Sequence, residues 1–137
     1  MATEAYSLEK DGDKKLSENF RVREFRCKDG SNTIFVDSDL VELLQKIRDH
    51  FNRPVTITSA YRTVSHNKAV GGSPNSQHLY GMAADIQVAD TPPEFVAQYA
   101  ESLLEGRGGI GLYPKKKGRA KGWVHVDVRK AKARWTQ

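Results

Sequence analysis

Apolar positions recur along the chain at the spacings of helices and strands. Two segments follow the helical period of about 3.6 residues. The first begins at Ser38, carries acidic residues in its first turn and ends before Pro54. The second follows Thr91, which matches a capping box with Glu94 and places Pro92 at the first helical position. Their predicted buried faces consist of Leu40, Leu43, Leu44, Ile47 and Phe51 in the first helix and Phe95, Val96, Tyr99, Leu103 and Leu104 in the second.

Four shorter segments have the composition or alternation of β-strands. They are VTITSA (55–60), AADIQV (83–88), GGIGLYP (108–114) and WVHVDV (123–128). The last two are predicted to form an antiparallel hairpin around the basic loop 115–122, and the stretch after residue 60 reads as a long functional loop. Together these elements predict an α+β fold, with helices flanking a small antiparallel sheet.

Length and charge limit the possible classes of protein. The 137 residues suit one small domain, which we expect at 16–137 after a polar arm of residues 1–15. No apolar run reaches the ~20 residues of a membrane span, and the start lacks the apolar core of a signal peptide, so the sequence as written predicts a cytoplasmic protein. The net charge of +5 comes largely from late lysines and arginines, which either favour an anionic partner or form a solvated surface.

Two of the four histidines stand in segments with metal-binding chemistry. His78 precedes Asp85 by seven residues, with small residues between them, and the period of two in WVHVDV places His125 on the same face as Trp123 and Asp127. Imidazole nitrogen and carboxylate oxygen are ligands of zinc, and three such ligands leave the fourth position of a tetrahedral shell open. The alternative is two unrelated histidines and two surface carboxylates. His50 and His66 lack such surroundings.

The segments SAYRT, SQHLYGMAAD and WVHVDV together resemble a known family. They are similar to the zinc D-Ala-D-Ala carboxypeptidase group of the peptidase M15 family, which shares its fold with the hedgehog signalling domain and includes phage L-alanyl-D-glutamate endolysins. The family pattern Ser-x-His-x-x-Gly-x-Ala-x-Asp is matched at five positions, and the resemblance extends over about residues 16–136. The matched residues are Ser76, His78, Gly81, Ala83 and Asp85.

The resemblance implies roles for particular residues. His78, Asp85 and His125 become the ligands of Zn²⁺, and Arg62 becomes the arginine beside the substrate, where it steadies an oxyanion or holds a carboxylate. A structural salt bridge is the other interpretation of Arg62. Weaker candidates for contact with the substrate are Ser76, Tyr61 and Trp123.

One departure from the family leaves the general base open. Several relatives have an acid three residues before the last histidine ligand, and others have a histidine two residues before it; these positions hold Gly122 and Trp123. Asp127 is the first candidate for the base, because strand alternation places it on the same face as His125. Its rival role is structural, as a partner of His125 or of Arg129.

The leading hypothesis is therefore a monomeric zinc metallopeptidase that hydrolyses peptidoglycan stem peptides or cross-links, like a D-Ala-D-Ala carboxypeptidase. An endolysin that cuts between L-Ala and D-Glu is an alternative, as is a zinc-containing module that binds wall peptides without turnover. A phage or prophage lysin would reach the wall without a signal peptide. Nucleic acid is not an expected partner, because the lysine loop lacks an evident row of stacking aromatic residues.

Overall fold

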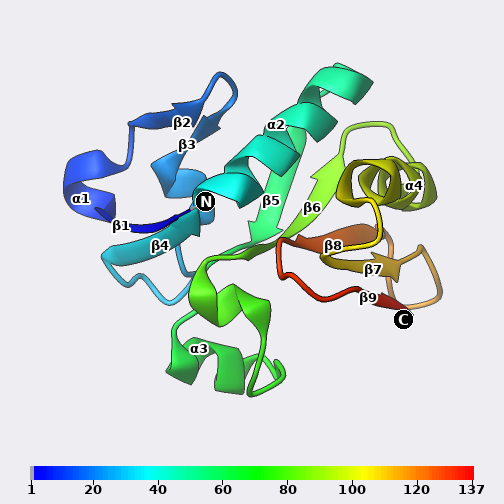
Figure 1. Ribbon diagram of the computed structural model, residues 1–137. Helices are drawn as coiled ribbons and strands as arrows, with labels where there is room; N and C mark the ends of the chain where they lie inside the picture. The colour runs from blue at the N-terminus through cyan, green and yellow to red at the C-terminus, as the bar shows by residue number, and fades with distance from the viewer. Residues whose placement is uncertain (1) are drawn as a thin grey trace.

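The computed structural model describes residues 2–137 and confirms the α+β class. Its centre is a five-stranded sheet with the strand order β5-β6-β8-β7-β9 (Figure 1). Neighbouring strands are antiparallel, as predicted, except for β7 and β9, which pair in parallel. The strands are β5 Val55–Ser59, β6 Ala83–Val88, β7 Gly109–Tyr113, β8 Trp123–Asp127 and β9 Ala133–Thr136.

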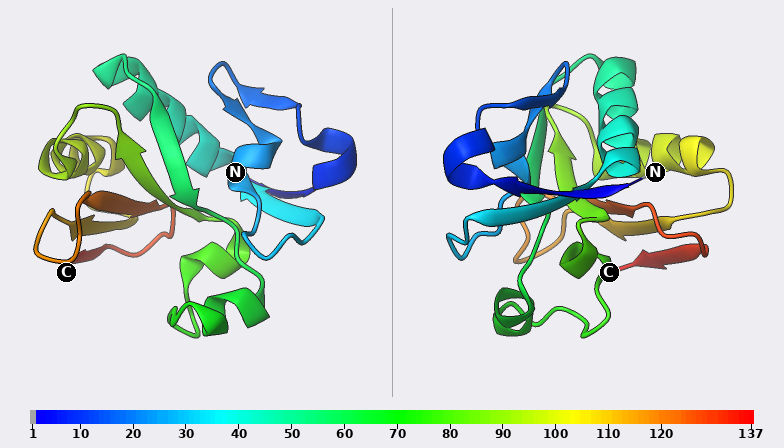
Figure 2. Two further views of the ribbon diagram at one scale, coloured as in Figure 1. Left: turned by 180° about the vertical axis from the view of Figure 1, so that it is seen from behind. Right: turned by 60° about the vertical axis from the view of Figure 1, so that its left-hand side comes forward.

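The two long helices, α2 (Ser38–Phe51) and α4 (Pro93–Leu104), lie side by side against one face of this sheet (Figure 2). Alternate residues of β6 and β8 point into the core between sheet and helices, as the period of two predicted. The opposite face therefore remains available for polar side chains. The core under the helices contains Leu40, Leu44, Ile47, Val55, Ile57, Ala84, Ile86, Val96, Ala100, Ile110, Val124 and Val126.

Helix α2 has the bounds that its apolar spacing predicted. The side chain of Asp37 caps it by accepting a hydrogen bond from the backbone N–H of Asp39, and Asn52 ends it in the left-handed conformation. No helix within residues 2–137, α2 included, is long and apolar enough to cross a membrane.

The predicted start of α4 is wrong by one residue. Pro92 is the N-cap and Pro93 takes the first helical position, so the predicted capping box does not form. The hydroxyl of Thr91 donates instead to the carbonyl of Ala89. Phe95 was predicted to be buried and is 58% exposed, because α4 packs on the core through Val96 and Ala100.

The N-terminal segment adds two small two-stranded sheets beside α2. Strand β1 lies in the predicted arm and pairs antiparallel with β4, so this arm is tied to the body of the protein. Phe20, Val22 and Phe25 from the following segment complete the core. The elements are β1 Thr3–Ser7, α1 Leu8–Asp11, β2 Lys15–Ser17, β3 Phe20–Arg21, the 3₁₀ helix η1 Val22–Phe25 and β4 Thr33–Asp37.

The segment between β5 and β6, predicted as a loop, contains two short helices. These are α3 (Val64–Ala69) and the 3₁₀ helix η2 (Gln77–Tyr80), which lie close together below the sheet in Figure 1. Gly81 ends η2 with φ +70°, and a Cβ there would lie 2.4 Å from the carbonyl oxygen of Phe35. A side chain at residue 81 would therefore separate η2 from β4.

Candidate metal centre

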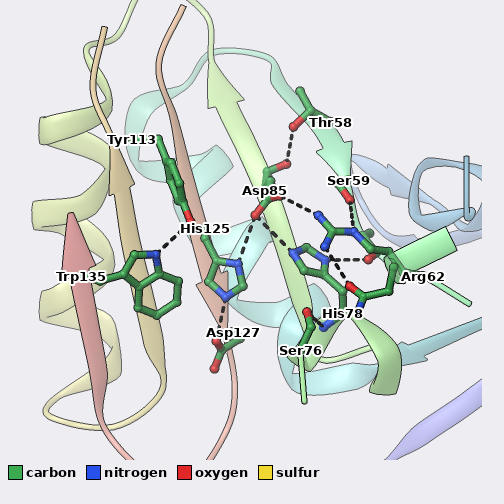
Figure 3. A network of polar contacts seen from close by, with 12 residues as sticks. Thr58, Ser59, Arg62, Ser76, His78, Asp85, Tyr113, His125, Asp127 and Trp135 are labelled. Carbon is green, nitrogen blue, oxygen red and sulfur yellow. Dashed lines mark hydrogen bonds and ion pairs between the residues drawn. The ribbon is translucent and has the colours of Figure 1, made fainter. Parts of the chain in front are cut away.

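Three predicted ligands meet on the sheet face that the helices leave uncovered (Figure 3). Asp85 on β6 stands opposite His125 on β8 in the antiparallel register. His78 comes from η2, which folds back over the end of β6 so that its imidazole reaches Asp85. The sheet register and the turn at Gly81 thus bring residues 78, 85 and 125 together.

The spacing of the three side chains suits a small divalent cation. Asp85 Oδ1 lies 3.3 Å from His78 Nε2 and 3.1 Å from His125 Nδ1. One ligand atom from each of the three residues lies within 4.8 Å of the others. A tetrahedral shell with zinc–ligand bonds of about 2.0 Å separates its ligand atoms by about 3.3 Å. The donor set of two imidazoles and a carboxylate therefore fits zinc in both chemistry and dimensions.

Hydrogen bonds on the far side of each imidazole determine which nitrogen faces the cluster. His78 Nδ1 lies 2.7 Å from the carbonyl oxygen of Ala60, which only accepts, so Nδ1 carries the proton and Nε2 is free to bind a cation. His125 Nε2 lies 2.7 Å from Asp127 Oδ2 and donates to that carboxylate. Each histidine can thus offer an unprotonated nitrogen toward Asp85.

Asp127 lies behind His125, on the side of the ring away from Asp85 (Figure 3). It is completely buried, and Arg129 donates to both of its carboxylate oxygens, at 2.8 and 2.6 Å. A Cβ at Gly109 would lie 2.0 Å from Asp127 Oδ2, so this carboxylate packs directly on the β7 backbone. These contacts favour the structural role of Asp127 over that of a base acting on substrate.

The carboxylates of the cluster are held in the ionised form. Burial raises the pKa of Asp85, but its interactions with the imidazoles of His125 and His78 outweigh burial and hold that pKa well below its usual range. Burial lowers the pKa of His125, yet the neighbouring carboxylates of Asp127 and Asp85 raise the pKa overall. The pKa of Asp127 falls because hydrogen bonds from His125 and Arg129 outweigh its burial. Both carboxylates thus stay ionised, and Asp85 offers an anionic oxygen to a cation.

Arg62 borders the cluster. Its Nη2 lies 3.5 Å from Asp85 Oδ2, while Nε donates to Ser59 Oγ and Nη1 to Asn67 Oδ1, each at 3.1 Å. The guanidinium is therefore fixed beside the candidate metal centre with its plane set by three neighbours.

The three weaker substrate candidates have mainly local contacts. The hydroxyl of Ser76 accepts from the backbone N–H of His78 and so caps η2. Tyr61 makes an edge contact with Phe35, with ring centroids 5.4 Å apart. Trp123 stacks on Tyr113 at 4.7 Å, with Arg119 beside both rings. Outside the cluster, His50 stacks on Tyr99.

Trp135 is a neighbour of the cluster that sequence reasoning missed. Its ring centroid lies 4.9 Å from that of His125, and its Nε1 donates to the hydroxyl of Tyr113 at 2.9 Å. It sits on Gly111, where a Cβ would lie 2.4 Å from the indole. Residues 130–135, KAKARW, do alternate polar and apolar positions, but two of the three apolar residues are alanines, which are poor strand formers.

The sequence profile of the Peptidase M15 family matches residues 18–127, which include all three candidate ligands, Arg62 and Asp127. This chain belongs to the Peptidase M15 family. The finding confirms the resemblance seen in SAYRT, SQHLYGMAAD and WVHVDV, and the α+β fold agrees with it.

The sequence of this M15 chain is similar to those of two curated peptidases. It is 46% identical over 35 residues to a zinc D-Ala-D-Ala carboxypeptidase of Streptomyces albus G, covering 26% of this chain and 14% of the relative. It is 33% identical over 82 residues to a probable peptidoglycan L,D-endopeptidase, MepK, of Haemophilus influenzae, covering 56% and 40%. The chain thus spans less than half the length of either relative.

Proposed function

We propose that this M15 protein is a zinc-dependent metallopeptidase that hydrolyses peptide bonds in peptidoglycan stem peptides or cross-links. The observation that carries the proposal is the cluster of His78, Asp85 and His125, with both imidazoles oriented by partners behind them. The names of the two relatives support wall peptides as the substrate class.

In this proposal the residues at and beside the cluster divide into metal ligands and a substrate-binding arginine. His78 Nε2, Asp85 Oδ1 and His125 Nδ1 hold the zinc ion. When bound, zinc supplies Lewis acidity that polarises the scissile carbonyl and activates water. Arg62, at 3.5 Å from Asp85, binds the oxyanion or a carboxylate of the substrate through its guanidinium.

We assign Asp127 to the positioning of His125 rather than to proton transfer. Its carboxylate is buried, faces away from Asp85 and is already bound by Arg129, so no substrate atom reaches it. By accepting the proton of His125 Nε2 it keeps Nδ1 directed at the metal position.

Mass spectrometry of stem peptides tests the proposal. Purified peptides of several wall types are incubated with the zinc-loaded protein, with and without phenanthroline, and with His78→Ala as the control. Chelator-sensitive loss of a terminal alanine would establish a carboxypeptidase. A cut between L-Ala and D-Glu or within a cross-link would establish an endopeptidase, as in a phage or prophage lysin that acts on the cell wall.

A second candidate is a wall-peptide binding module without turnover. The observation that favours it is Gly122, which stands where several relatives carry an acid and whose carbonyl accepts a hydrogen bond from Gln87. Unchanged peptides, from protein shown to contain zinc and to bind those peptides, would favour this module over the peptidase.

A further inference from the structure

Asn67 on α3 has a buried side-chain amide whose oxygen and nitrogen both form hydrogen bonds. Asn67 is only 3% exposed to solvent. The amide oxygen accepts from Arg62 Nη1 at 3.1 Å, and the amide nitrogen donates to the carbonyl of Ser73 at 2.8 Å. Asn67 therefore links Arg62 to the loop that leads into η2, the helix that carries His78.

Gly72 leaves the space that this link occupies. Its backbone N–H donates to the carbonyl of Asn67 at 2.8 Å. A Cβ at Gly72 would lie 2.0 Å from Asn67 Oδ1 and 3.0 Å from Arg62 Nη1. The loop thus closes directly over the hydrogen bond between Asn67 and Arg62, which no larger residue at 72 would permit without moving one of them.

The hydrogen bond to Asn67 holds Nη1 of Arg62, which the other neighbours of the guanidinium do not contact. Ser59 binds Nε, at the base of the guanidinium, and Asp85 lies 3.5 Å from Nη2. The third nitrogen, Nη1, is held by Asn67. Without Asn67, rotation about the last bonds of the Arg62 side chain would let the guanidinium turn away from the cluster. A long side chain gains conformational freedom when it loses a hydrogen-bond partner.

We propose that Asn67, with Gly72 packed on it, is a positioning residue that presets the guanidinium of Arg62 for substrate. This proposal rests on the proposed function in one respect, namely that Arg62 contacts the substrate. Asn67 itself acts only through Arg62. The proposal therefore predicts that the effect of changing Asn67 depends on the presence of Arg62.

Kinetics on wall peptides test that dependence. Asn67→Ala is expected to lower kcat/KM by about tenfold, divided between kcat and KM as for Arg62→Ala. Asn67→Asp keeps an oxygen for Arg62 and is expected to be less impaired than Asn67→Ala. The double variant Arg62→Ala/Asn67→Ala should be within about twofold of Arg62→Ala. The matched control is Asn75→Ala, at an exposed position of the same loop, which should behave as wild type.

Two kinetic results would overturn the proposal. One is an Asn67→Ala variant as active as Asn75→Ala. The other is a loss in Asn67→Ala that multiplies fully with that of Arg62→Ala, because independent effects multiply. Zinc content and melting temperature are measured for every variant, and Gly72→Ala replaces Asn67→Ala if the latter does not fold.

An NMR measurement separates this proposal from the proposed function. In zinc-loaded protein, the heteronuclear NOE of the Arg62 Nε–Hε group reports its motion on the picosecond to nanosecond timescale. We expect a rigid Arg62 in the wild type and in Asn75→Ala, and a mobile one in Asn67→Ala, near the value of the exposed Arg107. An equally rigid Arg62 in Asn67→Ala would overturn the proposal whether or not the protein hydrolyses peptides.

Discussion

His125 lies between two carboxylates that can be distinguished by experiment. Asp85 faces its Nδ1 and Asp127 its Nε2. We expect Asp127→Ala to weaken zinc binding by about 10- to 100-fold, because the imidazole loses the partner that orients it. Asp127→Asn retains an oxygen for Nε2 and should fall between Asp127→Ala and the wild type. Competition with a chromophoric chelator measures these affinities.

The same variants distinguish positioning from proton transfer. If Asp127 positions His125, saturating zinc restores much of the activity of Asp127→Ala. Unchanged zinc affinity together with lost kcat at saturating zinc would instead identify Asp127 as the general base and contradict our assignment.

Spacing alone leaves the grouping of His78, Asp85 and His125 open, and the resemblance to the M15 pattern implies it because that pattern is local in sequence. A fixed motif spacing carries the first two, and strand alternation places the third on the polar face. The contacts of Asn67 and Trp135 could not be predicted. They depend on a loop closing over Gly72 and on a parallel strand reaching Gly111, and the local sequence does not specify either partner.

Gly81 provides a residue-scale prediction about stability. Gly81→Ala introduces a Cβ 2.4 Å from the carbonyl of Phe35 at a residue with φ +70°. We expect a loss of more than about 2 kcal/mol in the free energy of unfolding, because steric overlap adds to the left-handed strain. Gly30→Ala is the matched control: its φ is +86° with no atom within 4 Å, so it should cost only about 1 kcal/mol. Equal losses in urea unfolding would show that the contact with β4 is unimportant.

At the scale of elements, the helices and strands that could be predicted are those with a strong hydrophobic period or a clear boundary residue. Helix α2 and strands β5 to β8 follow from apolar spacing and from Pro54. Strand β1 is polar and acquires its structure by pairing with β4, and α3 has no apolar face that would indicate a helix. Long-range pairing and local capping determine these elements, and neither leaves a pattern in the segment itself.

The ion pair between α4 and β9 predicts a pH-dependent contribution to stability. Arg134 donates to both oxygens of Glu101, each at 2.7 Å, and thereby lowers the pKa of Glu101. A lowered folded-state pKa stabilises the fold above the usual glutamate pKa of about 4.3, and this contribution is lost as the pH falls through the folded value.

Glu101→Gln should therefore be less stable than the wild type at pH 7, by at most about 1 kcal/mol because the pair is partly exposed. The difference should shrink below about pH 4. Urea unfolding of both proteins without zinc measures it, so that release of metal does not contribute. A difference that stays constant from pH 7 to pH 3 would show that the charge of Glu101 is irrelevant to it.

At the scale of the whole molecule, a metal at the cluster would add a cross-link between two parts of the fold. His78 comes from the segment 61–82, whereas Asp85 and His125 belong to the central sheet. A ligand that binds the folded state alone raises the free energy of unfolding, by about 2.7 kcal/mol at one hundred times its Kd. We therefore expect removal of zinc with a chelator to lower the melting temperature by several degrees.

When zinc binds at the cluster, the increase in melting temperature depends on the three ligands. His78→Ala should melt at one temperature with or without zinc, because it lacks one of three ligands. His50→Ala, which removes a histidine stacked on Tyr99 away from the cluster, should retain the full increase on adding zinc. An increase that survives in His78→Ala would place the stabilising metal elsewhere in the molecule, whereas its loss there and retention in His50→Ala would tie stability to the candidate centre.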